Sequence, residues 1–295
     1  MSIIIDKDTR IIVQGITGKE GAFWSDCMIR MGSRVVAGVT PGKEGQTACG
    51  APVYHSVRNA VAHCAADASM IFVPPKFAYD AVMEALDAGL KLAVTVADGI
   101  PLHEMARMRA AALRYGALVI GGNTSGIISA GKAMMGCFPY WIDRVYKPGR
   151  IGVMTRSGSL TNEVTAMVVE AGFGISTLLG VGGDPIPASR FAEFLPLYQS
   201  DPETDALVVI GELGGTMEEE VAQAIASGSF TKPVVAYLSG RTAPKGKKMG
   251  HAGAIISGGR GSVEDKSRAL EAAGVLVAMR PRQVGELLHK ALKKD

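Results

Sequence analysis

The sequence lacks the features that mark a secreted, metal-binding or membrane-spanning protein. Its 4 cysteines are scattered, with no C-x-x-C pair and no histidine at metal-ligand spacing, which argues against a disulfide framework and a zinc site. No apolar run reaches spanning length, and the first residues have neither the apolar core of a signal peptide nor the arginine-rich, acid-poor composition of a transit peptide. We therefore expect a cytoplasmic protein with no bound metal and no membrane contact.

Strong charge is also absent. The formal net charge is only +3 at pH 7, and the basic residues form short clusters rather than one long stripe. A nucleic-acid partner is therefore not expected, and local sites for anions fit this pattern better. What the chain does have is 295 residues, 47% of them hydrophobic, which is enough for two domains with apolar cores.

Short β-branched runs alternate with amphipathic stretches of helical length, a pattern typical of parallel sheets covered by helices. In the first half we predict strands at residues 11–15, 35–39, 69–73, 92–96 and 117–120, and helices at 20–31, 77–88 and 102–115. After a turn-rich segment at 146–149 we predict strands at 151–154, 175–179, 206–211 and 233–237, and helices at 160–171, 190–199, 218–227, 263–273 and 282–293. These elements predict two α/β domains, 1–146 and 147–295, without a long linker.

A glycine-rich turn follows the first predicted strand, where residues 14–21 read Gln-Gly-Ile-Thr-Gly-Lys-Glu-Gly. Such a turn before a helix is where a doubly wound sheet holds the phosphates of a nucleotide. The spacing G-x-x-G-x-x-G departs from the NAD pattern, and Lys43 follows the second strand where NAD binding usually requires an acid. Lys19 and Lys43 could instead neutralise the phosphates of coenzyme A. The alternative is a turn that serves packing alone.

One histidine, His251, lies in a glycine-rich and cation-rich loop between a predicted strand and a predicted helix. Imidazole is a good nucleophile toward phosphorus, and Lys245, Lys247, Lys248 and Arg260 are close enough in sequence to hold phosphoryl oxygens. The glycines of the loop would let this histidine swing between two sites. The alternative is a solvated basic loop whose histidine has no chemical role.

Two further segments place polar residues at the ends of predicted strands. Glu212 ends a buried strand before a glycine turn, and its carboxylate could hold one imidazole nitrogen of His251 so that the other stays nucleophilic. Ser157, Gly158 and Ser159 join a strand to a helix and offer free amides and hydroxyls to an anion. The alternatives are an acid favoured at a helix entry and a serine that only caps the helix.

Together these motifs resemble the α subunits of succinyl-CoA synthetases and related acid-thiol ligases, over essentially the whole chain. The resemblance rests on segments that occur in the same order, at residues 15–18, 38–43, 157–158, 182–185, 210–215, 242–246 and 250–254. It implies a Rossmann-like CoA-binding domain followed by a flavodoxin-like parallel α/β domain. It also implies a ligase of the tricarboxylic acid cycle that forms an acyl-CoA from a carboxylate, coenzyme A and ATP or GTP.

The resemblance implies roles for individual residues as well. His251 would be the phosphorylated histidine, Glu212 would support it, and residues 157–159 would open a helix aimed at the phosphohistidine. The carboxylate would become an acyl phosphate that the coenzyme A thiol displaces, while His251 carries the phosphoryl group between this site and the nucleotide. The residues expected to lie along coenzyme A are Thr17, Gly18, Lys19, Glu20, Lys43, Val96, Ala97 and Asp98.

A partner chain is implied too. The nucleotide and Mg²⁺ would bind a separate ATP-grasp β subunit, in an αβ or α2β2 assembly, and the α chain alone would be inactive. This agrees with a feature of the sequence, which has no G-x-x-x-x-G-K-[ST] loop to hold ATP.

The sequence departs from the succinate pattern where the family holds the acid. Residues 121–126 read Gly-Gly-Asn-Thr-Ser-Gly in place of Gly-Pro-Asn-Cys-Pro-Gly, and Asn162 stands where a tyrosine is usual. Succinate is the first substrate expected, with malate, citrate or another di- or tricarboxylate as alternatives. An NAD-dependent dehydrogenase and a non-catalytic CoA-binding protein stay open as other classes. The residues expected to face the acid are Asn123, Thr124, Ser125 and Asn162.

Overall fold

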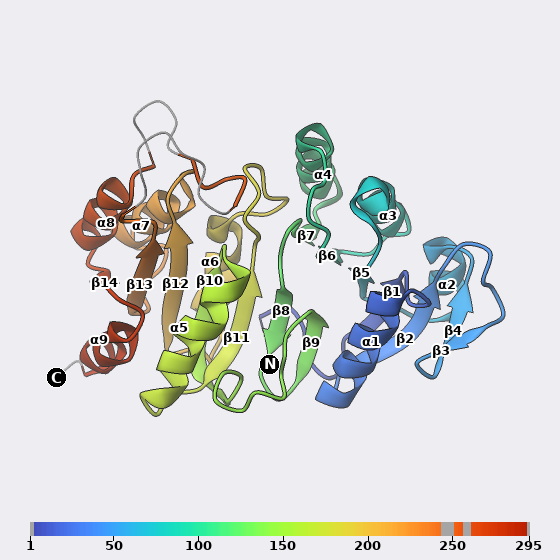
Figure 1. The fold of residues 1–295 in the computed structure, drawn as a ribbon, viewed down its shortest axis with the longest axis horizontal. Coiled ribbons are helices and arrows are strands. Elements are labelled where there is room, and N and C mark those ends of the chain that lie inside the picture. The colour runs from blue at the N-terminus through green and yellow to red at the C-terminus, as the bar shows by residue number, and fades with distance from the viewer. Residues whose placement is uncertain (1–2, 243–250, 256–260, 294–295) are drawn as a thin grey trace. The chain divides into compact units, whose positions relative to one another are not determined.

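The computed structural model describes residues 3–242, 251–255 and 261–293, which form two compact units (Figure 1). The N-terminal unit comprises Ile5–Phe138 and Ile186–Ser189. The C-terminal unit comprises Pro139–Pro185 and Arg190–Asp295, together with Met1–Ile4. Each unit is built on a mostly parallel sheet with helices on both faces, which confirms the predicted α/β class.

The sheet of the N-terminal unit has the strand order β3-β4-β2-β1-β5-β6-β7. The β3–β4 pair is antiparallel and the other neighbours are parallel. From β4 to β7 this is the order of a Rossmann-like sheet, with the topological switch point between β1 and β5, where such sheets bind ligands at the carboxyl ends of their strands. The strands are β1 Arg10–Gln14, β2 Arg34–Val39, β3 Thr47–Ala48, β4 Ala51–Tyr54, β5 Ala68–Ile71, β6 Leu92–Thr95 and β7 Leu118–Ile120.

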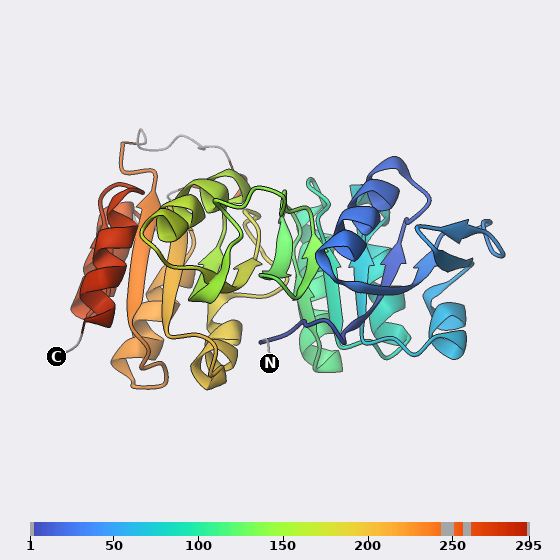
Figure 2. The ribbon, with the colours of Figure 1, turned by 90° about the horizontal axis from the view of Figure 1, so that it is seen from below.

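The helices of the N-terminal unit are α1 Lys19–Met31, α2 Val57–His63, α3 Pro75–Asp87 and α4 Leu102–Tyr115. Figure 2 shows α1 on one face of this sheet and α2, α3 and α4 on the other. Helix α1 ends at Gly32, whose φ of 112° is a left-handed conformation that favours glycine. An antiparallel pair, β8 Gly126–Ser129 and β9 Ala133–Gly136, packs against α1, and the Ser33 hydroxyl donates to the Met134 carbonyl at 2.8 Å.

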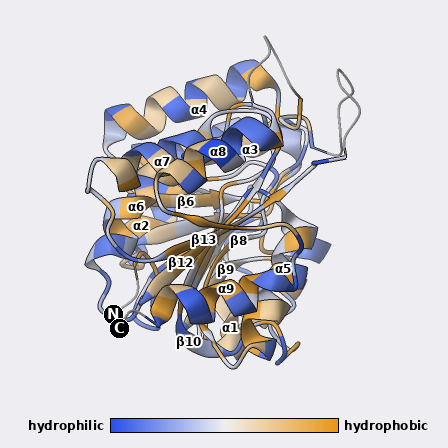
Figure 3. Ribbon diagram, turned by 90° about the vertical axis from the view of Figure 1, so that its left-hand side faces the viewer, coloured by the Kyte–Doolittle hydropathy of each residue, from blue (hydrophilic) through white to orange (hydrophobic). Residues whose placement is uncertain are grey.

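The sheet of the C-terminal unit has the parallel strand order β14-β13-β12-β10-β11. Counted within the unit, this is the order 2-1-3-4-5 of flavodoxin-like sheets. In Figure 3, helices α5 and α9 lie on one side of the strands, and α6, α7 and α8 lie on the other. The strands are β10 Pro148–Thr155, β11 Ile175–Gly180, β12 Ala206–Glu212, β13 Val234–Ser239 and β14 Leu276–Ala278. The helices are α5 Gly158–Glu170, α6 Phe191–Ser200, α7 Met217–Ala226, α8 Val263–Ala272 and α9 Gln283–Leu292.

The central strands supply the apolar cores, as their composition predicts. Every residue of β12 is buried, and so are the last four residues of β1. In Figure 3 the strands are orange, which marks hydrophobic residues. The helices also carry blue segments, which mark hydrophilic residues. None of the helices in the described part of the chain is long and apolar enough to cross a membrane. Polar residues that follow the buried strands are therefore held at the carboxyl edge of each sheet.

Candidate functional site

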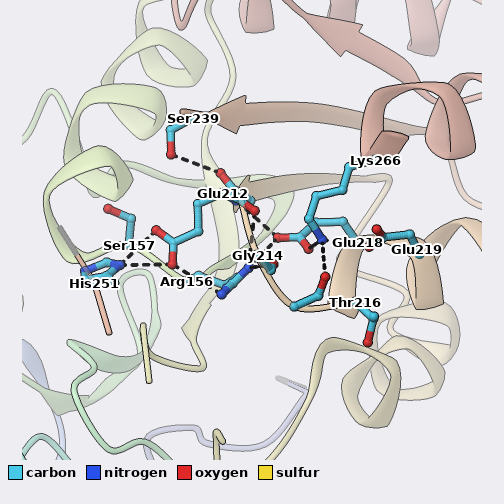
Figure 4. A network of polar contacts seen from close by, with 12 residues as sticks. Arg156, Ser157, Glu212, Gly214, Thr216, Glu218, Glu219, Ser239, His251 and Lys266 are labelled. Atoms are coloured by element: carbon cyan, nitrogen blue, oxygen red, sulfur yellow. Dashed lines mark hydrogen bonds and ion pairs between the residues drawn. The ribbon is translucent and has the colours of Figure 1, made fainter. Parts of the chain in front are cut away.

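The predicted histidine and glutamate meet in the C-terminal unit. Nδ1 of His251 lies 2.8 Å from Oε2 and 3.1 Å from Oε1 of Glu212, the last residue of β12 (Figure 4). The imidazole packs against Gly183, where an added Cβ would lie 2.3 Å from the ring. Only a residue without a side chain leaves room for the ring at this position. This explains why a glycine, Gly183, stands in the 182–185 segment.

The carboxylate fixes the state of the imidazole. An ionised carboxylate can only accept hydrogen bonds, so Nδ1 of His251 is the protonated nitrogen and Nε2 keeps its lone pair. The hydrogen bond to Glu212 raises the pKa of His251 above its ordinary value, against the opposing effects of burial and of Arg156. The side chain of Glu212 is only 8% exposed, whereas that of His251 is 26% exposed and can be reached from solvent.

The predicted anion socket forms the start of α5. The hydroxyl oxygen of Ser157 accepts a hydrogen bond from the Leu160 amide at 3.3 Å, so this serine caps the helix. Gly158 and Ser159 are exposed in the first turn, where helix amides lack partners within the helix. The capping alternative is therefore realised for Ser157, and phosphate binding at this turn stays a prediction.

Sequence reasoning missed a group of buried charges behind Glu212. Arg156 follows β10 and lies 3.4 Å from Glu212 and 3.3 Å from Glu218, measured between guanidinium nitrogens and carboxylate oxygens. Nζ of Lys266, on α8, lies 2.6 Å from Glu218 and 2.7 Å from Glu219. Figure 4 shows this row of contacts leading away from His251.

A second candidate site lies in the N-terminal unit. A cavity of about 630 Å³ opens at the carboxyl ends of β1, β2 and β5, which is the switch point of the sheet. Its lining residues are Gln14, Gly15, Val39, Thr40, Pro41, Val73, Pro74, Phe77, Asp80, Ala81 and Glu84. Most of the wall is apolar, with a few polar groups, as expected of a site for a cofactor with an organic body.

The glycine-rich turn after β1 and the turn after β2 are hydrogen-bonded to each other beside this cavity. Gly15 has a φ of 82°, and an added Cβ would lie 2.6 Å from the carbonyl oxygen of Phe72, so only glycine fits. The Thr17 hydroxyl donates to the Thr40 hydroxyl at 3.1 Å, and the amide of Lys43 donates to the Thr40 carbonyl at 3.1 Å. Five exposed residues of the predicted coenzyme A set lie on these two connected segments, namely Thr17, Gly18, Lys19, Glu20 and Lys43. Asp98, which is also exposed, follows β6 instead.

The remaining predicted residues of this unit lie beside each other after β6 and β7. Residues 96–98 follow β6, which is separated from β1 by β5, and they do not line the cavity. The amide of Asn123 donates to the carbonyl of Ala97 at 2.8 Å, so the predicted acid-binding segment contacts the predicted coenzyme A segment. The hydroxyl oxygen of Thr124 accepts from the Gly126 amide at 3.0 Å, and Ser125 follows in the same turn.

The fourth predicted substrate residue belongs to the C-terminal unit. Asn162 lies on α5, half-buried, and the Tyr146 hydroxyl donates to its Oδ1. Burial raises the pKa of the Tyr146 hydroxyl, which keeps it protonated and able to donate. Since Oδ1 is the acceptor, the amide group of Asn162 has its Nδ2 donors left for another acceptor.

Comparison with known proteins assigns both units. Residues 6–99 match the CoA binding domain, and residues 154–276 match the CoA-ligase domain. The chain is 68% identical over 290 residues to a subunit of an ADP-forming sulfoacetate–CoA ligase from an Acholeplasma species, across 98% of each chain. It is 66% identical over 292 residues to a subunit of such a ligase from Bilophila wadsworthia, across 99% of this chain and 100% of the relative. The chain belongs to the α-subunit family of ADP-forming CoA ligases.

This ligase α subunit also resembles enzymes for other acids. It is 49% identical over 292 residues to α subunit 2 of the ADP-forming succinate–CoA ligase of Archaeoglobus fulgidus, across 99% of this chain and 100% of the relative. The ATP citrate lyase of Methanothrix soehngenii, solved in complex with citrate and coenzyme A, matches with a TM-score of 0.89 and 26% identity. That match covers 98% of this chain and 50% of the lyase chain, so the ligase α subunit spans half the length of the lyase.

The predicted family and its coenzyme A-binding domain are thus confirmed. The prediction of succinate lacks the same support, because the two relatives of higher identity are named for sulfoacetate. The predicted lysines 245, 247 and 248 and Arg260 lie outside the described residues of the ligase α subunit. Within the described ranges, no group of three or more potential metal ligands occurs.

Proposed function

We propose that this chain is the α subunit of an ADP-forming sulfoacetate–CoA ligase in which His251 carries a phosphoryl group. The contact between His251 and Glu212 supports the chemistry, since it prepares one imidazole nitrogen as a nucleophile. Two relatives named for sulfoacetate, at 68% and 66% identity, support the acid, against 49% for a relative named for succinate. The sulfoacetate assignment replaces succinate as the leading substrate.

The geometry of His251 suits reversible phosphoryl transfer. The Nε2 lone pair attacks phosphorus and forms the N–P bond, while the P–O bond to the leaving group breaks and that oxygen keeps its electron pair. The proton stays on Nδ1, so the ring becomes positively charged, and the carboxylate of Glu212 stabilises that charge at 2.8 Å. In the reverse direction Nε2 is the leaving group and recovers its lone pair.

The N-terminal unit fits the binding of coenzyme A. The bare backbone of Gly15 at the cavity lets phosphates approach closely, and the exposed Lys19 and Lys43 lie on the turns that border it. The apolar wall of the cavity, which includes Phe77 and Pro41, suits an organic ring system. Coenzyme A, when bound, supplies the thiol that accepts the acyl group.

The acid-facing residues favour a strongly anionic substrate with several hydrogen-bond acceptors. Sulfoacetate carries a carboxylate to be activated and a sulfonate with three oxygens. Thr124 and Ser125 offer two hydroxyls in place of the cysteine and proline of the succinate pattern, beside the amide of Asn123 that both patterns share. Asn162 offers Nδ2 donors because Tyr146 occupies its Oδ1. A site built to hydrogen-bond one group discriminates strongly against acids that lack it.

The nucleotide is assigned to a partner. We propose that an ATP-grasp β subunit binds ATP and Mg²⁺ and assembles with this chain as αβ or α2β2. The isolated chain is then expected to bind coenzyme A and to form no thioester. ATP-dependent thioester synthesis by this chain alone would refute the division of labour.

The substrate is tested on the αβ complex. The chain is co-expressed with its ATP-grasp partner, and kcat/KM is measured for sulfoacetate, succinate, malate and citrate from ADP release and thioester formation. We expect sulfoacetate to lead by about ten- to a hundredfold or more, and Asn162→Tyr to shift the ratio toward succinate. A lead for succinate, malate or citrate would overturn the assignment of the acid. Binding of coenzyme A without ligase activity on any acid would favour a non-catalytic protein.

A further inference from the structure

We propose that Arg156, Glu218 and Lys266 form a charge relay that positions Glu212 on His251, so that Lys266 is a positioning residue for phosphoryl transfer. The proposal rests on the function proposed above, in which His251 is phosphorylated. It adds three residues that contact neither the imidazole nor any ligand site described for this chain.

The relay is a continuous row of opposite charges in the C-terminal unit (Figure 4). Nζ of Lys266 lies 2.6 Å from Oε2 of Glu218, and Oε1 of Glu218 lies 3.3 Å from Nη1 of Arg156. Nη2 of Arg156 lies 3.4 Å from Oε1 of Glu212, whose Oε2 lies 2.8 Å from Nδ1 of His251. Oε1 of Glu212 also lies 3.1 Å from Nδ1 of His251, so the guanidinium and the imidazole hold the carboxylate between them and set its rotation.

The same side chains hold the backbone around Glu212. Oε1 of Glu218 accepts the Glu212 amide at 3.2 Å, so the strand end is tied to α7. Nη1 of Arg156 donates to the carbonyl of Gly214 at 2.8 Å, and Nζ of Lys266 donates to the carbonyl of Gly215 at 2.9 Å. The relay therefore fixes both the carboxylate and the glycine turn that follows β12.

Burial makes this arrangement sensitive to the loss of any member. The side chains of Lys266 and Glu218 are 0% exposed, and that of Arg156 is 2% exposed. Burial alone would raise the pKa of Glu218, but Arg156 and Lys266 outweigh it and lower that pKa below its ordinary value. Arg156 and Lys266 face the buried carboxylates of Glu212 and Glu218, and Lys266 also pairs with the partly exposed Glu219 at 2.7 Å. Removing Lys266 therefore leaves the buried charge of Glu218 with less compensation.

The charges also explain why an apolar core would not serve here. A buried ion pair usually adds little stability compared with well-packed apolar residues, so stability alone does not account for the row. In phosphoryl transfer the imidazole gains a positive charge, and Glu212 must be ionised and already in place when this happens. Arg156 lies 3.4 Å from the carboxylate of Glu212 and holds it in place, and Glu218 with Lys266 keeps Arg156 where it can do so.

The test compares Lys266→Met with the double variant Glu218→Gln, Lys266→Met in the αβ complex. The single variant leaves Glu218 paired with Arg156 alone, which draws the guanidinium from Glu212, and we expect the rate of His251 phosphorylation to fall about tenfold with unchanged coenzyme A affinity. The double variant removes one charge of each sign, so the cluster keeps the net charge it has in the parent, and we expect it to regain most of the lost rate. A matched control is Lys232→Met, because Lys232 also donates to buried carbonyls but precedes β13 at the opposite end of the strands.

A spectroscopic measurement separates positioning from simple destabilisation. In the full-length chain with ¹⁵N-labelled histidine, the Nδ1–H form of His251 and its titration can be followed directly. Among the described residues, Glu212, Arg156 and Asp184 act on the imidazole, and the hydrogen bond to Glu212 has the largest effect on its pKa. Because Lys266→Met loosens this hydrogen bond, we expect the pKa of His251 to fall toward its ordinary value there and to recover in the double variant. Lys232→Met should leave it unchanged.

Two outcomes would overturn the relay. One is a Lys266→Met variant that loses thermal stability while its phosphorylation rate and its His251 titration match the parent. The other is a double variant as slow as the single one, although folded. If the parent complex itself shows no phosphohistidine, the proposed function fails, but the histidine titration still reports whether Lys266 acts on Glu212.

Discussion

The two units share one architecture and use different means at the carboxyl ends of their strands. In the N-terminal unit the site is an open cavity with an apolar wall, the bare backbone of Gly15 and exposed lysines such as Lys43. In the C-terminal unit the site is a half-buried His251 held by Glu212 and backed by buried charges. One site therefore uses shape and solvated cations, and the other uses charges withdrawn from water.

The difference matches two physical tasks. A ligand that is bound and released needs moderate interactions, and exposed cations contribute little each. A reaction that creates a charge needs groups that are already oriented in a medium of low polarity. We therefore expect substitutions in the C-terminal cluster to change rates and spare coenzyme A affinity, and substitutions at the N-terminal cavity to do the reverse.

The largest effect is expected at His251. His251→Asn removes the nucleophile, so the αβ complex should show no phosphorylation with labelled ATP and Mg²⁺ and no ligase activity, with coenzyme A affinity unchanged. The control is His289→Asn, since His289 contacts the Ala171 carbonyl at the end of α5 away from Ser157. Phosphohistidine is labile in acid and stable in alkali. Label that persists in the variant, or that resists acid, would contradict the assignment.

Glu212→Gln is expected to have the next largest effect. The amide keeps the size of the side chain but cannot stabilise a charged imidazole, so phosphorylation should slow by about two powers of ten. Coenzyme A affinity, measured by calorimetry, should stay within error of the parent. Glu170→Gln, an exposed position at the end of α5, serves as the control. A large loss of coenzyme A affinity with normal phosphorylation would break the contrast between the units.

Much of this contrast could be predicted from the sequence. The alternation of buried strands and amphipathic helices predicts both sheets, and a polar residue after a buried strand lies at the sheet's carboxyl edge, which brings Glu212 toward His251. Short strands were predicted unevenly, because runs of two to four residues show no readable period. Strands β5, β6 and β7 were predicted, whereas β3, β8, β9 and β14 were not.

The buried charges escaped prediction for a different reason. Glu218 resembles an ordinary acid in the first turn of a helix, and Lys266 stands among the charged residues of α8. A signal was nevertheless present: Val263, Lys266, Ser267 and Leu270 follow the spacing of one helix face, and all four are buried. A charge on an apolar helix stripe predicts burial, but its partner comes from another element and cannot be read from local spacing.

Gly15→Ala should affect the N-terminal unit. The added Cβ would meet the Phe72 carbonyl at 2.6 Å at a φ of 82°, so the turn must shift at a cost of about 1–3 kcal/mol in the free energy of unfolding. The shift moves the backbone that borders the cavity, and we expect a clear loss of coenzyme A affinity. Phosphorylation of His251 by ATP should remain, and its loss would show that the two sites are not separable in this way. Gly89→Ala is the control, because Gly89 is also at positive φ with open space around it but precedes β6, away from the carboxyl ends of the strands.

A pH effect should appear in the C-terminal unit. The pKa of His251 is raised in the folded chain, so the proton contributes stability that is fully present below about pH 6.5 and is lost as the pH rises through the raised pKa. Urea unfolding of the parent and of His251→Asn should therefore differ more at acid pH than at alkaline pH. A difference that is constant or grows with pH would show that Glu212 does not raise this pKa.

The smallest effect is expected at Lys43. Its side chain is exposed, so a contact with a coenzyme A phosphate is solvated, and Lys43→Gln should weaken coenzyme A binding only about two- to fivefold. The loss should shrink as salt is added, because salt screens exposed charges. Lys7→Gln is the control, an exposed lysine before β1 at the other end of the strands. Calorimetric titration of coenzyme A at low and high salt measures this dependence. A loss of affinity that does not depend on salt would mean that Lys43 acts through packing. The N-terminal site would then resemble the C-terminal one more closely than the exposure of Lys43 suggests.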